Sequence, residues 1–248
     1  MTSLTIGYSV LAERVKNIRQ PKVPDSELLV VVQNPNKATY AKTLDATYDE
    51  LASTGVAKSR NRALELAKGR FLVFADDDIE FEPAGLASIC QYMDEHPEVA
   101  IVLAQATDQT GKLRKNYPKS MEQLSLFNSA RAATYEMVVR VESIHTLGVS
   151  FDTDFGAGVE NYLGDEYIFI ADIIRAGGKG VFLPITIASH PEDSSGSGWG
   201  TDRDRIARAK VFSRVFRTMA PIIRLGFGLR RLSELGGTQN LVRFVFGR

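Results

Sequence analysis

Residues 69–83 read Gly-Arg-Phe-Leu-Val-Phe-Ala-Asp-Asp-Asp-Ile-Glu-Phe-Glu-Pro, a short apolar run followed by three consecutive acids. The run Phe71–Ala75 comes after a glycine and predicts a buried strand. Because alternate side chains share one side of an extended chain, Asp76 and Asp78 can converge on one point while Asp77 turns away. Two convergent carboxylates suit a hard cation such as Mg²⁺, which completes its shell with phosphates and water. A solvated acidic turn is the alternative, but the buried strand before the acids favours the metal.

Strands and helices are expected to alternate on both sides of this stretch. Apolar runs predict strands at 4–10, 28–32 and 99–104, and helices are expected at 56–68 and 83–95. This alternation predicts an α/β fold with a mostly parallel central sheet flanked by helices. Less regular patterns predict a helix at 11–20, a short helix within 112–131, strands at 135–141 and 181–187, and a helix at 165–176, whereas 36–54 and 148–164 show no regular pattern.

The composition is that of an ordinary globular protein, with 44% hydrophobic and 24% charged residues. A chain of 248 residues can form one large α/β domain, alone or with an appendage. The single cysteine, Cys90, excludes an intramolecular disulfide, and no Cys/His cluster has the spacing of a zinc site. The sequence shows neither a signal peptide nor an apolar segment long enough to span a bilayer, so a cytoplasmic location is expected.

Charge is distributed unevenly along the chain. Residues 203–248 contain eleven Lys or Arg and two acids, a net charge of +9, and the other 202 residues carry −9. We therefore expect a main domain at 1–192, and a loop with a basic amphipathic helical extension at 193–248. Within the extension, Pro221 is expected to kink or divide a helix that carries an apolar stripe and a line of arginines: Phe212, Val215, Phe216, Met219, Ile222 and Ile223, beside Arg214, Arg217, Arg224 and Arg231.

This basic extension has two interpretations. The apolar stripe can pack on the main domain while the arginines are solvated. Basic amphipathic helices also bind anionic lipid surfaces, and nine excess positive charges over 46 residues favour a peripheral location on the inner face of a membrane. Nucleic acid is not expected as a partner, because the segment contains no known nucleic-acid-binding motif.

Three motifs occur in a definite order: Asp76-Asp77-Asp78 after one strand, Gly164-Asp165-Glu166 at the start of a helix, and His190-Pro191 after the following strand. With these motifs the sequence, over roughly residues 3–192, resembles the family 2 glycosyltransferases, which have the GT-A fold. The family's recurrent pattern A-R-N-x-x-L/G-x-x-A-x-G-x-Y/F-x-x-F-L-D-x-D is similar to S-R-N-R-A-L-E-L-A-K-G-R-F-L-V-F-A-D-D-D at residues 59–78.

The resemblance implies an inverting transferase with a nucleotide-sugar donor, UDP-linked in our expectation. Its acceptor would be a saccharide or a lipid-linked saccharide, in cell-surface polysaccharide or glycoconjugate synthesis. Mn²⁺ or Mg²⁺ would be held by Asp78, helped by Asp76 and His190, although His190 can also be an ordinary loop histidine. Donor-site positions are expected at Arg60, Asn61, Asp76 and Asp77. Arg60, at a helix start, would add a positive charge near the diphosphate, and the alternative is that it is a surface residue. Gln33 and Asn34 stand where many members have a base-recognising acid, and their amides can pair with a uracil edge.

Two adjacent acids are candidates for the catalytic base. The family usually has Gly-Glu-Asp about ten residues before Ala-Gly, whereas this chain has Gly164-Asp165-Glu166. Counting back from Ala176-Gly177 puts Glu166 at the position of the base and leaves Asp165 as a second candidate. Alternatively, both acids only stabilise the helix N-terminus through its dipole.

Two loops are expected to be flexible. The segments 107–130 and 192–200 are expected to close over the donor, and Trp199 to stack on a sugar or to be buried.

Other functions are less consistent with the positions of the motifs. A nucleotidylyltransferase would need a glycine-rich phosphate loop after the first strand, where this chain has Gly7-Tyr8-Ser9-Val10. An aspartyl phosphatase would carry its acids after the first strand rather than the third. A catalytically inactive GT-A module, which binds a nucleotide or serves as a scaffold, is the open alternative.

Overall fold

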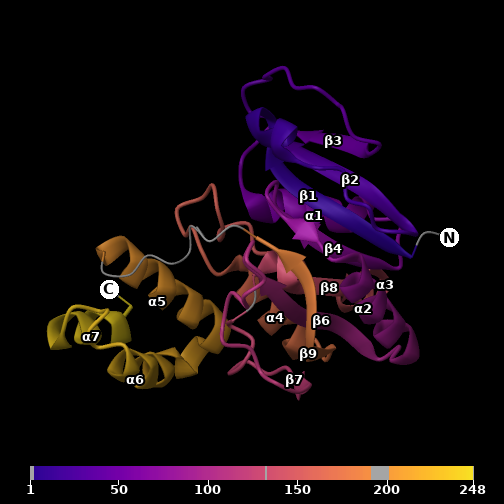
Figure 1. Cartoon of the computed structure of the whole chain (residues 1–248). Helices are drawn as coiled ribbons and strands as arrows, with labels where there is room; N and C mark the ends of the chain where they lie inside the picture. Colours follow the sequence, from indigo (N-terminus) through magenta and orange to yellow (C-terminus); the bar gives the residue numbers. More distant parts are fainter. Residues whose placement is uncertain (1–2, 132, 191–200, 248) are drawn as a thin grey trace.

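The computed structural model describes residues 3–131, 133–190 and 201–247, and these residues build one nine-stranded sheet (Figure 1). Eight strands follow the order β3-β2-β1-β4-β8-β6-β9-β5, and β7 pairs with β9. Neighbours are parallel from β3 to β4 and between β6 and β9, whereas β8 runs antiparallel to β4 and β6. The strands are β1 Leu4–Leu11, β2 Ser26–Gln33, β3 Thr47–Leu51, β4 Phe71–Ala75, β5 Glu80–Phe81, β6 Val99–Thr107, β7 Glu122–Gln123, β8 Met137–Arg140 and β9 Lys179–Ser189.

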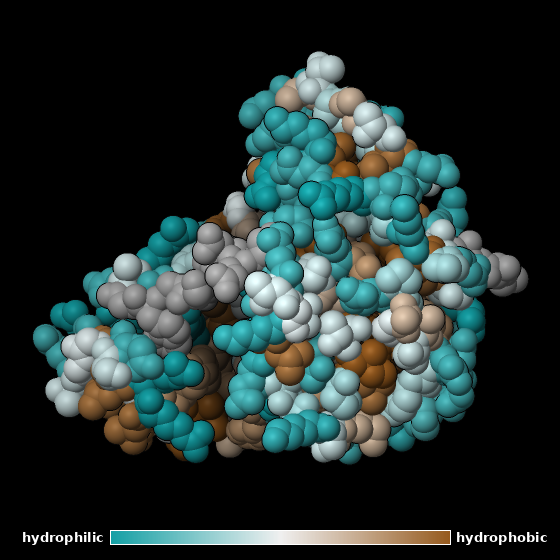
Figure 2. Space-filling model, viewed as in Figure 1, coloured by the Kyte–Doolittle hydropathy of each residue, from teal (hydrophilic) through white to brown (hydrophobic). Residues whose placement is uncertain are grey.

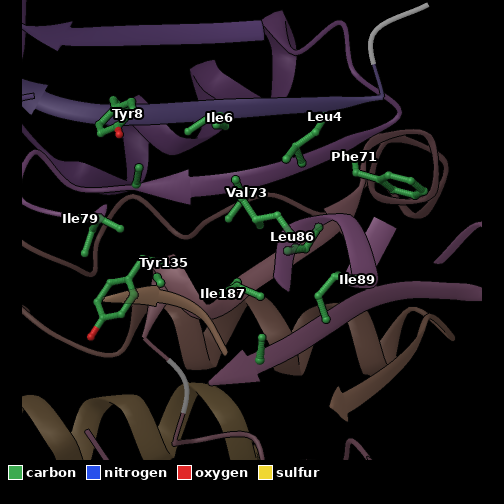
Figure 3. Packing of buried hydrophobic residues seen from close by; sticks show 14 of the residues in the cluster. Leu4, Ile6, Tyr8, Phe71, Val73, Ile79, Leu86, Ile89, Tyr135 and Ile187 are labelled. Atoms are coloured by element: carbon green, nitrogen blue, oxygen red, sulfur yellow. The ribbon is translucent and has the colours of Figure 1, made fainter. Parts of the chain in front are cut away.

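Helices cover both faces of the sheet, so the central strands β1, β2, β4, β6 and β8 are mostly buried on both sides. Successive strand residues point to opposite faces, and β4 therefore directs Val73 into one core and Leu72 into the other. The first core lies against α2 (Pro83–Glu95), whose Leu86 and Ile89 face the sheet (Figure 3). The second core lies under α1 (Val56–Leu66), α3 (Val141–Leu147) and α4 (Asp165–Arg175).

The expected elements around the acidic triplet are confirmed. The strand β4 and the helix α2 have the bounds that the sequence predicts, and the sheet is mostly parallel. Pro83 occupies the first turn of α2, where a missing N–H costs nothing. Gly85 lets α2 approach β9 closely, because a Cβ at this position would lie 2.0 Å from the Thr186 carbonyl oxygen.

The structure corrects the expected elements in four places. Where a helix was expected at 11–20, residues 12–17 form the 3₁₀ helix η1 (Ala12–Asn17), and the described segment 112–131 contains no helix. The strand expected at 135–141 is shortened to β8, because η2 (Thr134–Glu136) precedes it and α3 begins directly after it. Residues 47–51, for which no regular pattern was found, form β3. Strand β3 is only partly buried and lacks the apolar alternation that would reveal it. Helix α3 has seven residues and ends at Gly148 in the left-handed conformation, so it is too short to show a helical period.

The C-terminal residues form a helical lobe beside α4 (Figure 1). It consists of α5 (Asp202–Phe216), η3 (Arg217–Met219), α6 (Ala220–Arg230) and α7 (Thr238–Val245). The helical segment is divided, as the sequence predicts, but the break lies at Arg217, whose φ is 50°, and Pro221 occupies the first turn of α6. None of the helices in the described part of the chain combines the length and apolarity needed to cross a bilayer.

Helix α5 is fastened to the main domain. Val215 and Phe216 share a core with α4. Arg214 donates to Asp172 (2.7 Å) and to Asp152 (2.8 Å). This part of the predicted apolar stripe therefore packs on the domain, and Arg214 is structural. The boundary at residue 192 remains a prediction, and Trp199, Pro191 and the 192–200 loop lie outside the described residues.

Candidate active site

A cavity of about 840 Å³ opens at the carboxyl edge of the sheet. Parallel strands end at the same edge, so residues far apart in sequence meet there. Its wall includes Ser9 from β1, Gln33 from β2, the three acids after β4, Arg60 from α1, Asp165 and Glu166 from the first turn of α4, and His190 after β9. The sequence motifs thus converge on one cavity.

The acidic triplet divides as strand alternation predicts. Asp77 is buried and turns towards η1, where it accepts hydrogen bonds from Arg14 Nε (2.9 Å) and Asn17 Nδ2 (2.8 Å). Asp76 and Asp78 each retain an exposed part of the side chain and line the cavity. Asp77 therefore secures the loop after β4, and its two neighbours are the carboxylates available to a ligand.

Arg60 is buried between two of the acids. Its guanidinium forms an ion pair with Asp165 and lies 3.5 Å from Asp76 Oδ1. Burial by itself lowers the pKa of Arg60, but the carboxylates of Asp165, Asp76 and Glu166 outweigh burial and raise it. Arg60 therefore neutralises the acidic wall of the cavity and joins the start of α4 to the end of β4.

Glu166 has the electrostatic environment of a carboxyl group that exchanges a proton near neutral pH. Burial, followed by the charge and the hydrogen bond of Asp165, raises the pKa of Glu166 to about 8, and the positive charge of Arg60 opposes this change. Asp165 is itself buried and committed to Arg60. The two candidate bases thus occupy different environments: Asp165 is buried in an ion pair, whereas Glu166 is partly exposed and has a raised pKa.

His190 lies between a carboxylate and a guanidinium. Its Nε2 is 3.5 Å from Asp78 Oδ1, and its Nδ1 is 2.8 Å from Arg114 Nη1. Arg114 also donates to the His190 carbonyl oxygen (2.8 Å), and the ring stacks on Tyr135. Because a guanidinium can only donate, Nδ1 accepts, and a neutral His190 carries its proton on Nε2. In this tautomer Nε2 faces Asp78 as a donor rather than as a metal ligand.

The residues present fit a divalent cation through carboxylates. Asp76 and Asp78 face the same cavity. The pKa of Asp76 is raised, because burial and the negative charge of Asp78 together outweigh the opposing effect of Arg60. A cation between the two acids would relieve their repulsion. Within the described ranges, no group of three or more His, Cys, Asp or Glu side chains is arranged to hold a metal ion. Protein carboxylates would therefore supply only part of the shell, as is usual for Mg²⁺ with phosphate ligands.

The amide side chains carried over from the sequence have internal partners. Gln33 lines the cavity, but its Oε1 accepts from the Gly55 amide (2.8 Å) and its Nε2 donates to Ser59 (3.3 Å). Asn34 closes a turn through both hydrogen bonds to Ala38, and the Asn61 amide binds the backbone of Phe151. Asn34 and Asn61 are not among the residues that line the cavity, so they shape the framework around it.

Sequence reasoning missed a set of polar side chains on the cavity wall: Ser9, Arg14, Arg114, Lys115, Arg131 and Tyr162. Arg114 and Lys115 follow β6 in an irregular segment without periodicity, so no sequence signal indicates which way their side chains point. Lys115 is held by Glu136, a buried acid 2.9 Å away. Ser9 is buried, and its hydroxyl has no hydrogen-bond partner among the described residues.

The sheet order and the carboxylates at its carboxyl edge define a fold of the GT-A type. The model of the family described as glycosyl transferase family 2 matches residues 7–153, more than half of the chain. The chain therefore belongs to this family.

Crystal structures of TarS from S. aureus share the fold. The TarS structure has 17% sequence identity and a TM-score of 0.60, over 97% of this chain and 45% of that chain. TarS 1–349 in complex with UDP-GlcNAc has 17% identity and a TM-score of 0.60, over 94% and 73%. The complex with UDP has 16% identity and a TM-score of 0.59, over 93% and 72%. The chain thus spans less than half of the longer TarS chain.

Proposed function

We propose that the protein is an inverting glycosyltransferase that moves a sugar from a UDP-linked donor to a saccharide or lipid-linked saccharide acceptor. The observation that carries this proposal is the position of Glu166 in the same cavity as Asp76 and Asp78. A base and a leaving-group site on one cavity are what an in-line displacement requires. The UDP and UDP-GlcNAc complexes of TarS support the choice of nucleotide.

Donor binding in this proposal uses the ends of β1 and β4. The Ser9 hydroxyl, which has no hydrogen-bond partner in the part of the chain that the structure describes, is buried at the cavity wall, where a ligand hydrogen bond would remove the cost of leaving it unsatisfied. Asp76 and Asp78 would hold Mn²⁺ or Mg²⁺, which, when bound, neutralises charge developing on the departing diphosphate. A ligand role for His190 requires Arg114 to release Nδ1. Arg114, Lys115 and Arg131 add positively charged side chains to the same cavity wall.

Glu166 is the proposed base. It would accept the proton of the acceptor hydroxyl as the oxygen attacks the anomeric carbon from the face opposite the diphosphate. Protonation also removes a buried negative charge from beside Asp165, so the burial and the repulsion that raise the pKa of Glu166 both favour uptake of the proton. Arg60 and Asp165 act as positioning residues, because their ion pair orients the first turn of α4.

Donor turnover separates this proposal from the inactive-module alternative. We would incubate the full chain with a panel of nucleotide sugars and Mn²⁺ or Mg²⁺, and measure thermal shift together with nucleoside diphosphate release. An active enzyme releases diphosphate in the presence of an acceptor, whereas a scaffold binds nucleotide without releasing it from the sugar. A role in cell-surface polysaccharide synthesis and a peripheral location on the cytoplasmic face of a membrane are further parts of the proposal.

A further inference from the structure

The outer surface of the C-terminal lobe exposes large apolar side chains. Helix α6 presents Ile222, Leu225 and Leu229 to solvent at steps of three and four residues, and Ile222 is 70% exposed. Figure 2 shows hydrophobic residues over this lobe, at the lower left of the view. Six of the nine large hydrophobic residues exposed in the described part of the chain lie within residues 219–246, and these six are termed the lobe patch: Met219, Ile222, Leu225, Leu229, Val242 and Phe246.

The lobe does not need this patch in order to fold, because its own core is already closed. Phe244 is fully buried and packs with Leu241 from α7 and Leu235 before it. Arg224 is also buried: its guanidinium donates to the Val245 carbonyl oxygen (2.9 Å) and bonds to Ser213. The inner sides of α6 and α7 are therefore committed to each other and to α5, and the exposed stripe is a separate feature of the outer side.

Positive charge borders the lobe patch. Arg230 follows Leu229 and Arg243 follows Val242, so each is rotated by about 100° around its helix and lies beside the apolar residue; both arginines are exposed. From residue 217 to residue 247 the sequence has five arginines and a single acid, Glu234. Arg224 is buried and Arg231 pairs with Glu234, so Arg217, Arg230 and Arg243 are the exposed arginines outside that ion pair. Arginine stems can lie along apolar surface while their charged ends reach outwards. An apolar stripe with a cationic border matches a surface that is anionic outside and apolar beneath.

We propose that the lobe patch docks on the surface of an anionic membrane. Ile222, Leu225, Leu229 and Phe246 enter the boundary between headgroups and acyl chains, and the neighbouring arginines contact lipid phosphates. The complementarity of charge favours an anionic lipid surface over a protein partner. The sequence-based assignment of the whole arginine line to lipid is thereby revised, because Arg214 and Arg224 are structural.

Docking would orient the cavity relative to the membrane. Helix α5 connects the patch to α4 through the Arg214–Asp172 ion pair, and Glu166 lies in the first turn of α4. An enzyme held in this way would present its cavity at a constant height and angle to a membrane-borne acceptor. This docking rests on the peripheral location proposed above but not on catalysis, so flotation without turnover tests it separately from the proposed activity.

The test is flotation of the full chain with vesicles of phosphatidylcholine alone or with about 30% phosphatidylglycerol, at low and high salt. The protein should float with anionic vesicles at low salt, and much less at high salt or with neutral vesicles. The triple substitution I222Q/L225Q/L229Q should lower binding at least about tenfold, and R230Q and R243Q about fivefold each at low salt. Thermal unfolding should be unchanged in each variant, because all five side chains are exposed.

The matched control removes exposed apolar side chains elsewhere. L113Q/M121Q should float like the wild type, because both residues are exposed outside the lobe. The proposal is overturned if the wild type does not float, or if the triple variant floats as well as the wild type does. It is also overturned if sedimentation shows a dimer that the triple substitution dissociates while vesicle binding is absent, since a second copy of the chain then covers the patch.

Discussion

Replacing Glu166 with glutamine should abolish transfer and at the same time stabilise the protein above pH 5. The folded-state pKa of Glu166 is about 8, against an ordinary value of 4.5. Below pH 4.5 the carboxyl is protonated in both the folded and the unfolded state, and it costs nothing. As the pH rises towards 8, the unfolded chain loses this proton while the folded protein retains it, so the free energy of unfolding falls. Glutamine carries no charge, and E166Q escapes this loss.

The size of the effect follows from the same two values. Between pH 4.5 and pH 7 the raised pKa of Glu166 lowers the free energy of unfolding by about 1.4 kcal/mol per pH unit, which sets an upper limit of about 3 kcal/mol on its destabilising effect at pH 7. Because Glu166 is only half-buried, solvent screening reduces the expected gain to about 1 to 3 kcal/mol. For a chain of this length the melting temperature of E166Q should exceed that of the wild type by about 2 to 10 °C.

Differential scanning fluorimetry between pH 5 and pH 9 measures the stability difference, and product formation measures transfer. At pH 7 about one tenth of Glu166 is ionised, so kcat/KM of the wild type should rise about tenfold between pH 7 and pH 9. E160Q is the matched control, since Glu160 is an exposed acid paired with Lys210 and should show neither effect. Parallel stability curves for the wild type and E166Q would refute the reasoning. If E166Q is active and D165N is inactive, Asp165 is the catalytic base instead of Glu166.

Three further substitutions test the cavity. D78N should preserve the fold and remove the Mn²⁺ dependence of UDP affinity in calorimetry, and an undiminished metal effect would exclude Asp78 as a ligand. S9A removes a buried hydroxyl that has no partner among the described residues, so the stability of the free protein should be unchanged or slightly higher. The same substitution should weaken UDP binding about five- to tenfold, and an unchanged affinity would exclude Ser9 from the donor site. R60M leaves the carboxylates of Asp165 and Asp76 unpaired and should cost about 3–5 kcal/mol, with a smaller loss at pH 5 than at pH 8 because the acids can then be protonated. R62M, at a half-exposed arginine of the same helix, should cost under about 1 kcal/mol in the same unfolding assay.

Local features of the chain were predictable from the sequence because their causes are local. The apolar run before the acids defines β4, Pro83 defines the start of α2, and strand alternation separates Asp77 from its neighbours. The acids after β4 and His190 after β9 lie at one sheet edge, because parallel strands place their carboxyl ends together. Strand β3 and helix α3 were missed because the first is only partly buried and lacks apolar alternation, and the second is shorter than two helical periods.

The partner of each long side chain was decided by the tertiary structure alone. Arg60 was expected near a diphosphate, but α4 brings Asp165, 105 residues away, into contact with it. The same holds for Arg114 and His190, which are 76 residues apart. In the C-terminal segment, one helical period produced a single apolar stripe in the sequence, whereas packing on α4 buries Val215 and Phe216 and leaves Ile222 in solvent. Periodicity records which residues share a face of a helix, but only the neighbouring elements determine whether that face meets protein or water.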